Sequence, residues 1–126
     1  MRIQRRGEQA ITAPQVHDGP GELTIDRYFP GVSRLPVSVH VWEFPPGAGE
    51  GPHTHDEDDS LAELYLVVRG SVRVTSGDET AELHEGDALY AAPGEEHGVL
   101  NHTDRPATLV LVWGPPAVTA PGSPTR

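Results

Sequence analysis

The sequence has no cysteine and no lysine, and each absence excludes a class of chemistry. Without cysteine the chain can form no disulfide, present no thiolate to a metal and offer no thiol nucleophile. Without lysine it can neither form a Schiff base with a carbonyl substrate nor hold a nucleotide phosphate through a P-loop lysine. Histidines, carboxylates, tyrosines and arginines therefore remain as the groups that could do chemistry.

Positive charge is scarce as well, because nine arginines are outnumbered by nineteen acidic residues and the formal net charge is −10. Such an acid surplus repels the phosphates of nucleic acids and the headgroups of anionic membranes, so we expect neither as a partner. No apolar run approaches the roughly 20 residues of a membrane span, and no signal-peptide pattern follows Met1. We therefore expect a cytoplasmic protein whose partner is a small molecule.

Helical periodicity is also missing, whereas short β-branched runs recur between turn residues. We expect strands at 37–44, 61–68, 71–75, 80–84, 88–92, 99–102 and 107–113, with a hairpin turn at 76–78. Short strands with turn signals about every 8 to 12 residues are typical of β-sandwiches and barrels. The 126-residue chain is thus predicted to be a single all-β domain with little helix.

The two ends of the chain differ from its middle. Residues 1–30 carry weaker strand signals, around Ile3 and at 23–25, and we expect this arm to pair along a sheet edge of its own subunit or of a neighbour. The arm leads us to expect a homodimer. The barrel itself is predicted to span 31–114, and the tail at 115–126, rich in proline, alanine and threonine, is predicted to be disordered.

Three histidines and one glutamate stand out by their spacing. His53 and His55 lie two residues apart, which in extended backbone points both imidazoles to the same side, and His97 follows a tight turn. Glu63 opens the most apolar strand of the chain, where a buried carboxylate is costly unless a cation compensates it. A divalent transition metal such as Fe, Mn, Co, Ni, Cu or Zn accepts ligands of this kind.

These residues lie in two motifs that resemble those of the cupin superfamily. The first is Gly47-(x5)-His53-x-His55 followed by Glu63-(x6)-Gly70, and the second is Gly86, Ala92, Gly94, His97 and Asn101. The second motif departs from the family at Ala92, where proline is usual, and Pro93 comes one place late. The first departs more, because seven residues separate His55 from Glu63 where the family usually has three or four.

The resemblance covers roughly residues 35–114. It implies an antiparallel jelly-roll β-barrel with a metal ion at its centre. It also implies that His53, His55, Glu63 and His97 are the metal ligands. Without the motifs, an isolated pair of histidines at this spacing would more often be a surface or structural feature.

The long spacer makes the identity of the acidic ligand a choice between two residues. Asp59 occupies the position that the commoner spacing would name, whereas Glu63 keeps the family spacing to Gly70. Glu63 is favoured because sheet geometry would hold its side chain inside the barrel. Asp59 belongs to the acidic run 56–59, whose mutual repulsion favours a solvated loop, with a mobile flap over the metal site as the functional alternative.

Strand alternation predicts what else surrounds the metal. If Glu63 points inward, Tyr65 and Val67 point inward as well. The inner faces of the neighbouring strands would then carry His40 and Trp42 on one strand, and Leu109, Leu111 and Trp113 on the other. His40 and Tyr65 are the polar groups of this apolar and aromatic pocket, and therefore the candidates for proton transfer. For the two tryptophans, plain core packing explains the positions equally well.

The pocket composition favours a neutral or aromatic substrate. Sites for sugar phosphates or free amino acids need a cationic clamp, and among the arginines only Arg69 shares the parity of Glu63. We therefore expect a metal-dependent enzyme for a small, largely apolar or aromatic metabolite. Its chemistry would be of the cyclase, isomerase or oxygenase type that the resemblance implies. The alternative is a non-catalytic module, a sensor or carrier, that holds a ligand in the same barrel.

Overall fold

The computed structural model describes residues 1–54 and 61–114, which fold into two antiparallel β-sheets. His55, the acidic run at 56–59 and the tail at 115–126 lie outside the described residues. In the described part of the chain, the only helical element is a short 3₁₀ turn, η1 (Val16–Asp18). No helix among these residues is long and apolar enough to cross a membrane.

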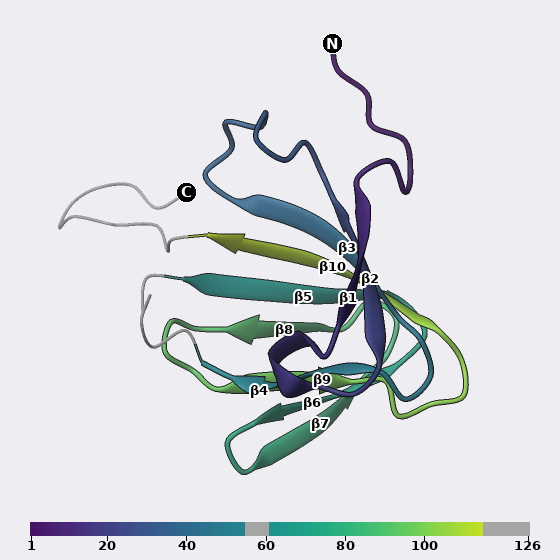
Figure 1. The fold of residues 1–126 in the computed structure, drawn as a ribbon. Helices are drawn as coiled ribbons and strands as arrows, with labels where there is room; N and C mark the ends of the chain where they lie inside the picture. The colour runs from purple at the N-terminus through teal and green to yellow at the C-terminus, as the bar shows by residue number, and fades with distance from the viewer. Residues whose placement is uncertain (55–60, 115–126) are drawn as a thin grey trace, which may run out of the picture.

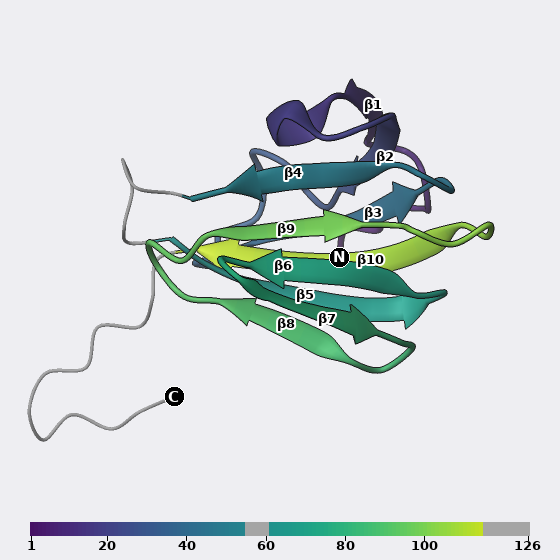
Figure 2. The ribbon, with the colours of Figure 1, turned by 90° about the horizontal axis from the view of Figure 1, so that it is seen from below.

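The two sheets form facing layers. The larger sheet has the order β1 (Ala10–Pro14), β2 (Glu22–Arg27), β3 (Ser38–Phe44), β10 (Ala107–Gly114), β5 (Ala62–Arg69) and β8 (Ala88–Ala91). The smaller has the order β4 (Gly49–His53), β9 (His97–Leu100), β6 (Val72–Ser76) and β7 (Glu79–Leu83). Figure 1 shows β3, β10, β5 and β8 of the larger sheet above the strands of the smaller one, and Figure 2 shows the smaller sheet in front of the larger one. The predicted all-β jelly-roll fold is confirmed.

The core lies between the layers because alternate residues of each strand point inward. On β5, Tyr65 and Val67 are fully buried, whereas Leu64 and Val68, which flank them in the strand, are exposed. Residues of the second sheet, such as Val74, complete the same hydrophobic cluster. Successive side chains of a strand point to opposite faces of the sheet. The alternation that predicts the strands therefore also determines which side chains face the interior.

A β-bulge overturns the expected direction of Arg69. On β10, Leu109 pairs with Val67 of β5. The residue before Leu109 is Thr108, which pairs with Arg69 instead of Val68. The extra residue moves Arg69 to the outer face of the sheet, where it lines a groove together with Thr108 and Glu43. Arg69 thus does not share the inner face of Glu63.

The strand β4 is not among the predicted strands, because its sequence Gly-Glu-Gly-Pro-His lacks β-branched and aromatic residues. Its glycines are needed because another segment of backbone packs directly against them. A Cβ atom on Gly51 would overlap the carbonyl oxygen of His17 in η1, and one on Gly19 would overlap the carbonyl oxygen of Gly49. The 3₁₀ turn therefore lies directly on the backbone of β4.

The N-terminal arm pairs within its own chain. Its strand β2 pairs with β3, and β1 pairs with β2. The turn η1 between β1 and β2 is unusual, because Gln15, His17 and Asp18 all have left-handed backbone angles, with φ of 50°, 48° and 62°. Non-glycine residues adopt this region at a cost of about 1 kcal/mol or more each.

The outer face of the larger sheet is apolar across the three strands β8, β5 and β10. Leu64, Val68 and Tyr90 are exposed there, at 38%, 46% and 60% of their surface. Register pairs Leu64 with Tyr90 on β8 and with Val112 on β10, so these side chains form one continuous patch. An apolar patch that spans several strands is typical of protein interfaces.

We expect the homodimer to form through this outer face, and Leu64→Glu to break it. The introduced charge would have to lose its water in the interface, which is costly. Light scattering at micromolar concentration should give twice the chain mass of 13.5 kDa for the parent protein and a monomer for the variant. Leu35→Glu, at an exposed leucine outside the patch, is the control and should stay dimeric. A monomeric parent protein would contradict the expectation.

Candidate metal centre

Three predicted ligands from three strands converge between the sheets. His53 ends β4, Glu63 lies near the start of β5, and His97 begins β9. His53 and His97 are register partners, and the ligand atoms of all three side chains lie within 4.8 Å of one another. His97 Nε2 lies 3.2 Å from Glu63 Oε1. The sequence spacing and the fold therefore agree on these three residues.

Backbone carbonyls orient both imidazoles. His53 Nδ1 lies 2.9 Å from the carbonyl oxygen of Gly51, and His97 Nδ1 lies 2.9 Å from that of Glu95. A carbonyl oxygen can only accept a hydrogen bond, so each Nδ1 carries a proton and each ring turns its Nε2 toward the cluster. Metal-binding histidines are held in this way. Nε2 of His97 faces the Glu63 carboxylate here, so a metal ion would take the place of the proton between them. The contacts thus fix the tautomer in which Nε2 can ligate a metal.

The electrostatics of the two imidazoles differ. Burial lowers the pKa of His53 to about 4, although the hydrogen bond to the Gly51 carbonyl acts to raise it. Burial also acts to lower the pKa of His97, but its hydrogen bonds to Glu63 and to the Glu95 carbonyl outweigh this and raise it. His53 is therefore neutral at pH 7, which is the form that binds a metal ion.

The donor set fits a divalent transition metal. Two imidazole nitrogens and one carboxylate oxygen are the ligands that Mn, Fe, Co, Ni, Cu and Zn accept in proteins. Glu63 is 7% exposed, so its charge needs a nearby cation, and a metal ion held with His53 and His97 would supply it. The fourth predicted ligand, His55, and the alternative ligand Asp59 lie outside the described residues.

A second carboxylate, Glu50, lies beside this cluster. It is 4% exposed, and the hydroxyl of Tyr65 donates a 2.7 Å hydrogen bond to its Oε1. Burial raises the pKa of Glu50 to about 7, and burial together with the two neighbouring carboxylates raises that of Tyr65 well above its usual value. Tyr65, whose ring meets His97 edge to face at 5.6 Å, therefore keeps its proton and acts as a donor.

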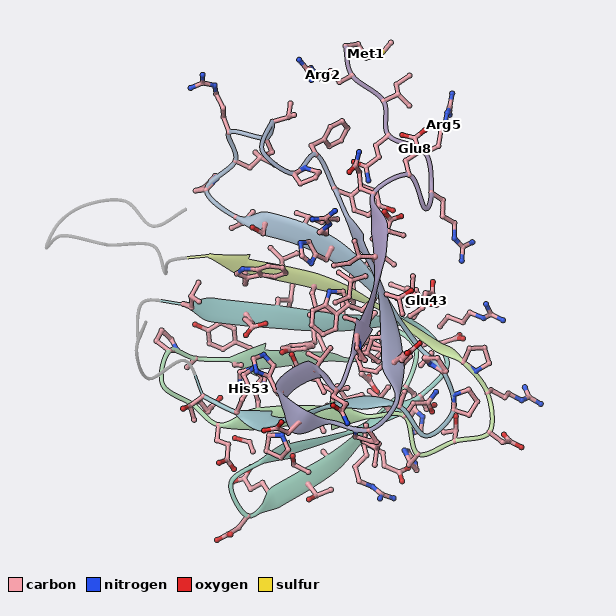
Figure 3. All side chains as sticks on the ribbon, viewed as in Figure 1. Met1, Arg2, Arg5, Glu8, Glu43 and His53 are labelled. Carbon is pink, nitrogen blue, oxygen red and sulfur yellow. The ribbon has the colours of Figure 1, made fainter. Side chains whose placement is uncertain are left out.

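The N-terminal turn adds His17 to the same neighbourhood. Its ring stacks on that of His53 with centroids 3.6 Å apart, and its Nε2 lies 3.9 Å from Glu50 Oε2. Figure 3 shows His53 beside this turn. Sequence reasoning missed both His17 and Glu50, because neither belongs to the motifs. The glycines on either side of Glu50 were the available signal, since they indicate a close approach of another segment.

His40, the other predicted proton-transfer group, lies away from the cluster. Register connects it through Leu111 to Tyr65, which places two strand spacings, about 10 Å, between them. Its ring meets Trp113 edge to face at 4.2 Å, and its Nδ1 lies 3.3 Å from the indole nitrogen of Trp42. Burial, followed by the nearby Arg27, lowers the pKa of His40 to about 4.

The residues predicted to form the pocket wall fall into two groups. Val67, Leu109 and Leu111 are fully buried and pack with Trp42 in the hydrophobic core. Trp113 instead lines, together with His40, a pocket of about 520 Å³ between β3, β10 and the 28–37 loop. Because Trp113 is the register partner of Glu63, this pocket adjoins the metal-ligand cluster.

Comparison with known proteins places the chain in a family. A family model described as "Cupin domain" matches residues 40–113. The chain is 31% identical over 98 residues to (R)-mandelonitrile lyase from Granulicella tundricola, which covers 77% of this chain and 72% of that protein. It is 35% identical over 75 residues to the beta-alanine degradation protein BauB of Pseudomonas aeruginosa, which covers 56% of this chain and 73% of that protein.

Solved structures share the fold. A predicted oxalate decarboxylase from Thermotoga maritima superposes with a TM-score of 0.80 at 17% identity, covering 92% of this chain and all of that one. A Cupin 2 conserved barrel domain protein from Salinispora arenicola superposes with a TM-score of 0.70 at 23% identity, covering 90% and 88%. At these identities the likeness concerns the arrangement of strands alone.

Removing the carboxylate of Glu63 should weaken metal binding strongly. We expect Glu63→Gln to lower the affinity for Co²⁺ or Zn²⁺ by about 100-fold or more, because loss of an outer partner of a ligand already costs 10- to 100-fold. Titration against a competing chelator measures this. Asp59→Asn and the exposed Glu79→Gln are the comparison variants and should change little. A larger effect of Asp59→Asn would transfer the acidic ligand to that residue.

The tautomer of His40 can be read directly by ¹⁵N NMR. Because an indole N–H only donates, its contact with His40 Nδ1 makes that nitrogen the acceptor and leaves the proton on Nε2. With a pKa of about 4, this neutral form should persist from pH 8 down to about 5. A proton on Nδ1 of the neutral ring would show that the Trp42 contact does not form in solution. Protonation of His40 at its ordinary value near 6.5 would show that the burial of the ring is lost.

Proposed function

This chain belongs to the cupin family, and on that premise we propose that it is a metal-dependent enzyme acting on a small, largely apolar or aromatic organic metabolite. The observation that carries the proposal is the pair of imidazoles, each turned by a backbone carbonyl, that meet the buried carboxylate of Glu63. Such pre-orientation is needed to bind a metal, whereas core packing alone does not require it. The likeness to a mandelonitrile lyase supports chemistry on an aromatic compound.

His53, Glu63 and His97 would hold the metal ion, together with His55 by the family resemblance. When bound, the ion would supply Lewis-acid polarisation of a substrate oxygen or, if redox-active, a site for oxygen chemistry. The protein's own contribution is a fixed coordination geometry. It comes from three strands of two sheets and from the carbonyls of Gly51 and Glu95.

Tyr65 is the group that we assign to proton handling next to this site. Its hydroxyl proton points at Glu50 Oε1, 2.7 Å away, and its ring contacts the ligand His97. A donor and an acceptor that lie in contact and are buried can hold or pass a proton without exchange with bulk water. The carboxylate of Glu50 also fixes the rotamer of Tyr65, which is itself fully buried.

The substrate would occupy the pocket that adjoins Glu63. Phe29 and Trp113 give this pocket aromatic walls, and its volume of about 520 Å³ suits a small molecule. Aromatic walls favour a flat or apolar body over a sugar. The metal site would then engage the polar end of the substrate that reaches Glu63.

A substrate panel on metal-loaded protein tests the proposal. We expect at least one compound among aromatic hydroxynitriles, aromatic hydroxyketones and catechols, each offered with and without a carboxylate substituent, to be turned over. The turnover should be lost in Glu63→Gln and after chelation, and kept in Glu79→Gln, since only Glu63 belongs to the ligand set. Running each assay under air and under argon separates oxygenase chemistry from cyclase, isomerase or lyase chemistry.

The same panel distinguishes the enzyme from a binding module. Saturable binding of these compounds to the metal-loaded protein, with no turnover above that of free metal ion, would contradict the proposal. That outcome would favour the sensor or carrier function, in which the barrel only holds its ligand.

A further inference from the structure

The pocket beside the metal-ligand cluster carries a pair of hydrogen-bond donors whose role the metal centre does not explain. Arg27 and His40 are register partners on β2 and β3, and both line the pocket. They lie on the inner face, opposite to Asp26, whose side chain accepts a hydrogen bond from the Gly7 amide on the other side of β2. A cationic and a neutral donor thus stand side by side on one pocket wall.

His40 presents a proton to the pocket. Its Nδ1 accepts the indole N–H of Trp42, so the remaining nitrogen, Nε2, bears hydrogen. The edge contact with Trp113 holds the plane of the ring. Among the described residues, Nε2 of His40 has no hydrogen-bond partner, although the ring is half-buried. A fixed donor of this kind is suited to an acceptor oxygen of a ligand.

Arg27 is held in place through its Nε, while the other N–H groups of its guanidinium remain available to a ligand. Its Nε donates to the carbonyl oxygen of Gln9 at 3.3 Å, and the described residues offer the guanidinium no carboxylate partner within salt-bridge distance. A guanidinium donates through several N–H groups in one plane, a geometry that matches the two oxygens of a carboxylate. An unpaired arginine in a pocket wall is therefore a natural anion contact.

The N-terminal arm preforms this wall. The side-chain amide of Gln4 donates to the carbonyl oxygen of Arg27 at 2.8 Å and accepts from the amide of Phe29 at 2.7 Å. Phe29 has a left-handed backbone, with φ of 49°, which is costly for a phenylalanine. The two hydrogen bonds of Gln4 hold that conformation, and with it the turn by which Phe29 lines the pocket.

We propose that Arg27 and His40 anchor a carboxylate group of the ligand, whose aromatic or aliphatic body lies against Trp113 and Phe29. This deepens the proposed function, on which it rests for the identity of the site, because it names the group by which the substrate is held at the end of the pocket away from the metal. A single arginine with one neutral donor suits one carboxylate among apolar walls.

Matched probes test the anchor without any reaction. 3-Phenylpropionate and its neutral isostere 3-phenylpropanamide differ in charge but hardly in shape, and Trp113 fluorescence reports their binding. We expect the acid to bind the full chain at least about tenfold more tightly than the amide, since a hydrogen bond to a charged group is stronger than one between neutral groups.

Variants assign the preference to the two residues. Arg27→Gln should weaken binding of the acid about tenfold or more and leave the amide unchanged, and His40→Phe should weaken the acid while keeping the edge contact with Trp113. Arg69→Gln, at an exposed arginine on the outer face, is the control and should have no effect. Arg27→Gln does not touch the core, so the test stands even if His40→Phe fails to fold.

Chelation separates this inference from the proposed function. Binding of the acid should be the same within about twofold before and after removal of metal by a chelator, because neither anchor residue is a metal ligand. Equal binding of acid and amide, an unchanged affinity in Arg27→Gln, or a need for metal would each overturn the anchor. Loss of turnover with the anchor intact would instead count against the proposed function alone.

Discussion

The arrangement of this protein depends on one buried carboxylate. Glu63 stands near the start of a strand whose other inward residues, Tyr65 and Val67, have no exposed surface. Its burial would be unfavourable without a compensating positive charge or donor, and the fold brings two imidazoles to it from the opposite sheet. The carbonyls of Gly51 and Glu95 then turn Nε2 of both imidazoles toward the same point. The jelly roll makes this arrangement possible, because its two layers bring side chains from separate strands to one place.

The N-terminal arm takes part in both halves of the proposed site. At one end, η1 lies on the glycine-rich strand β4 and stacks His17 on His53. At the other, Gln4 clamps the turn that faces the aromatic pocket. In both places the backbone adopts left-handed conformations at residues other than glycine. Strain of this kind persists only where surrounding contacts enforce it, and here the enforced positions lie next to candidate ligand-binding groups.

Much of the fold could be predicted from the sequence, because alternation in strands such as β5 shows which side chains are buried. The candidate ligand Glu63 could be recognised for the same reason, as an acid in an apolar strand. What could not be predicted depends on contacts distant in sequence. Strand β4 is determined by the turn that lies on it, and Glu50 gains its role only when Tyr65 reaches it. Arg69 was expected on the inner face, but a single β-bulge moves it to the outer face. The alternation of residues along the strand could not reveal this bulge. Arg27 takes its place in the pocket only through the pairing of the arm with β3.

The central claim is that the three converging side chains bind a metal ion. Anomalous diffraction from crystals grown with Co²⁺ or Zn²⁺ tests it most directly, because the signal locates the ion independently of any assay. We expect a peak about 2.0–2.2 Å from Nε2 of both His53 and His97 and from a carboxylate oxygen of Glu63. We also expect that the direct contact between His97 and Glu63, 3.2 Å here, gives way to coordination. A peak elsewhere, or an unoccupied site with that contact intact at saturating metal, would contradict the account.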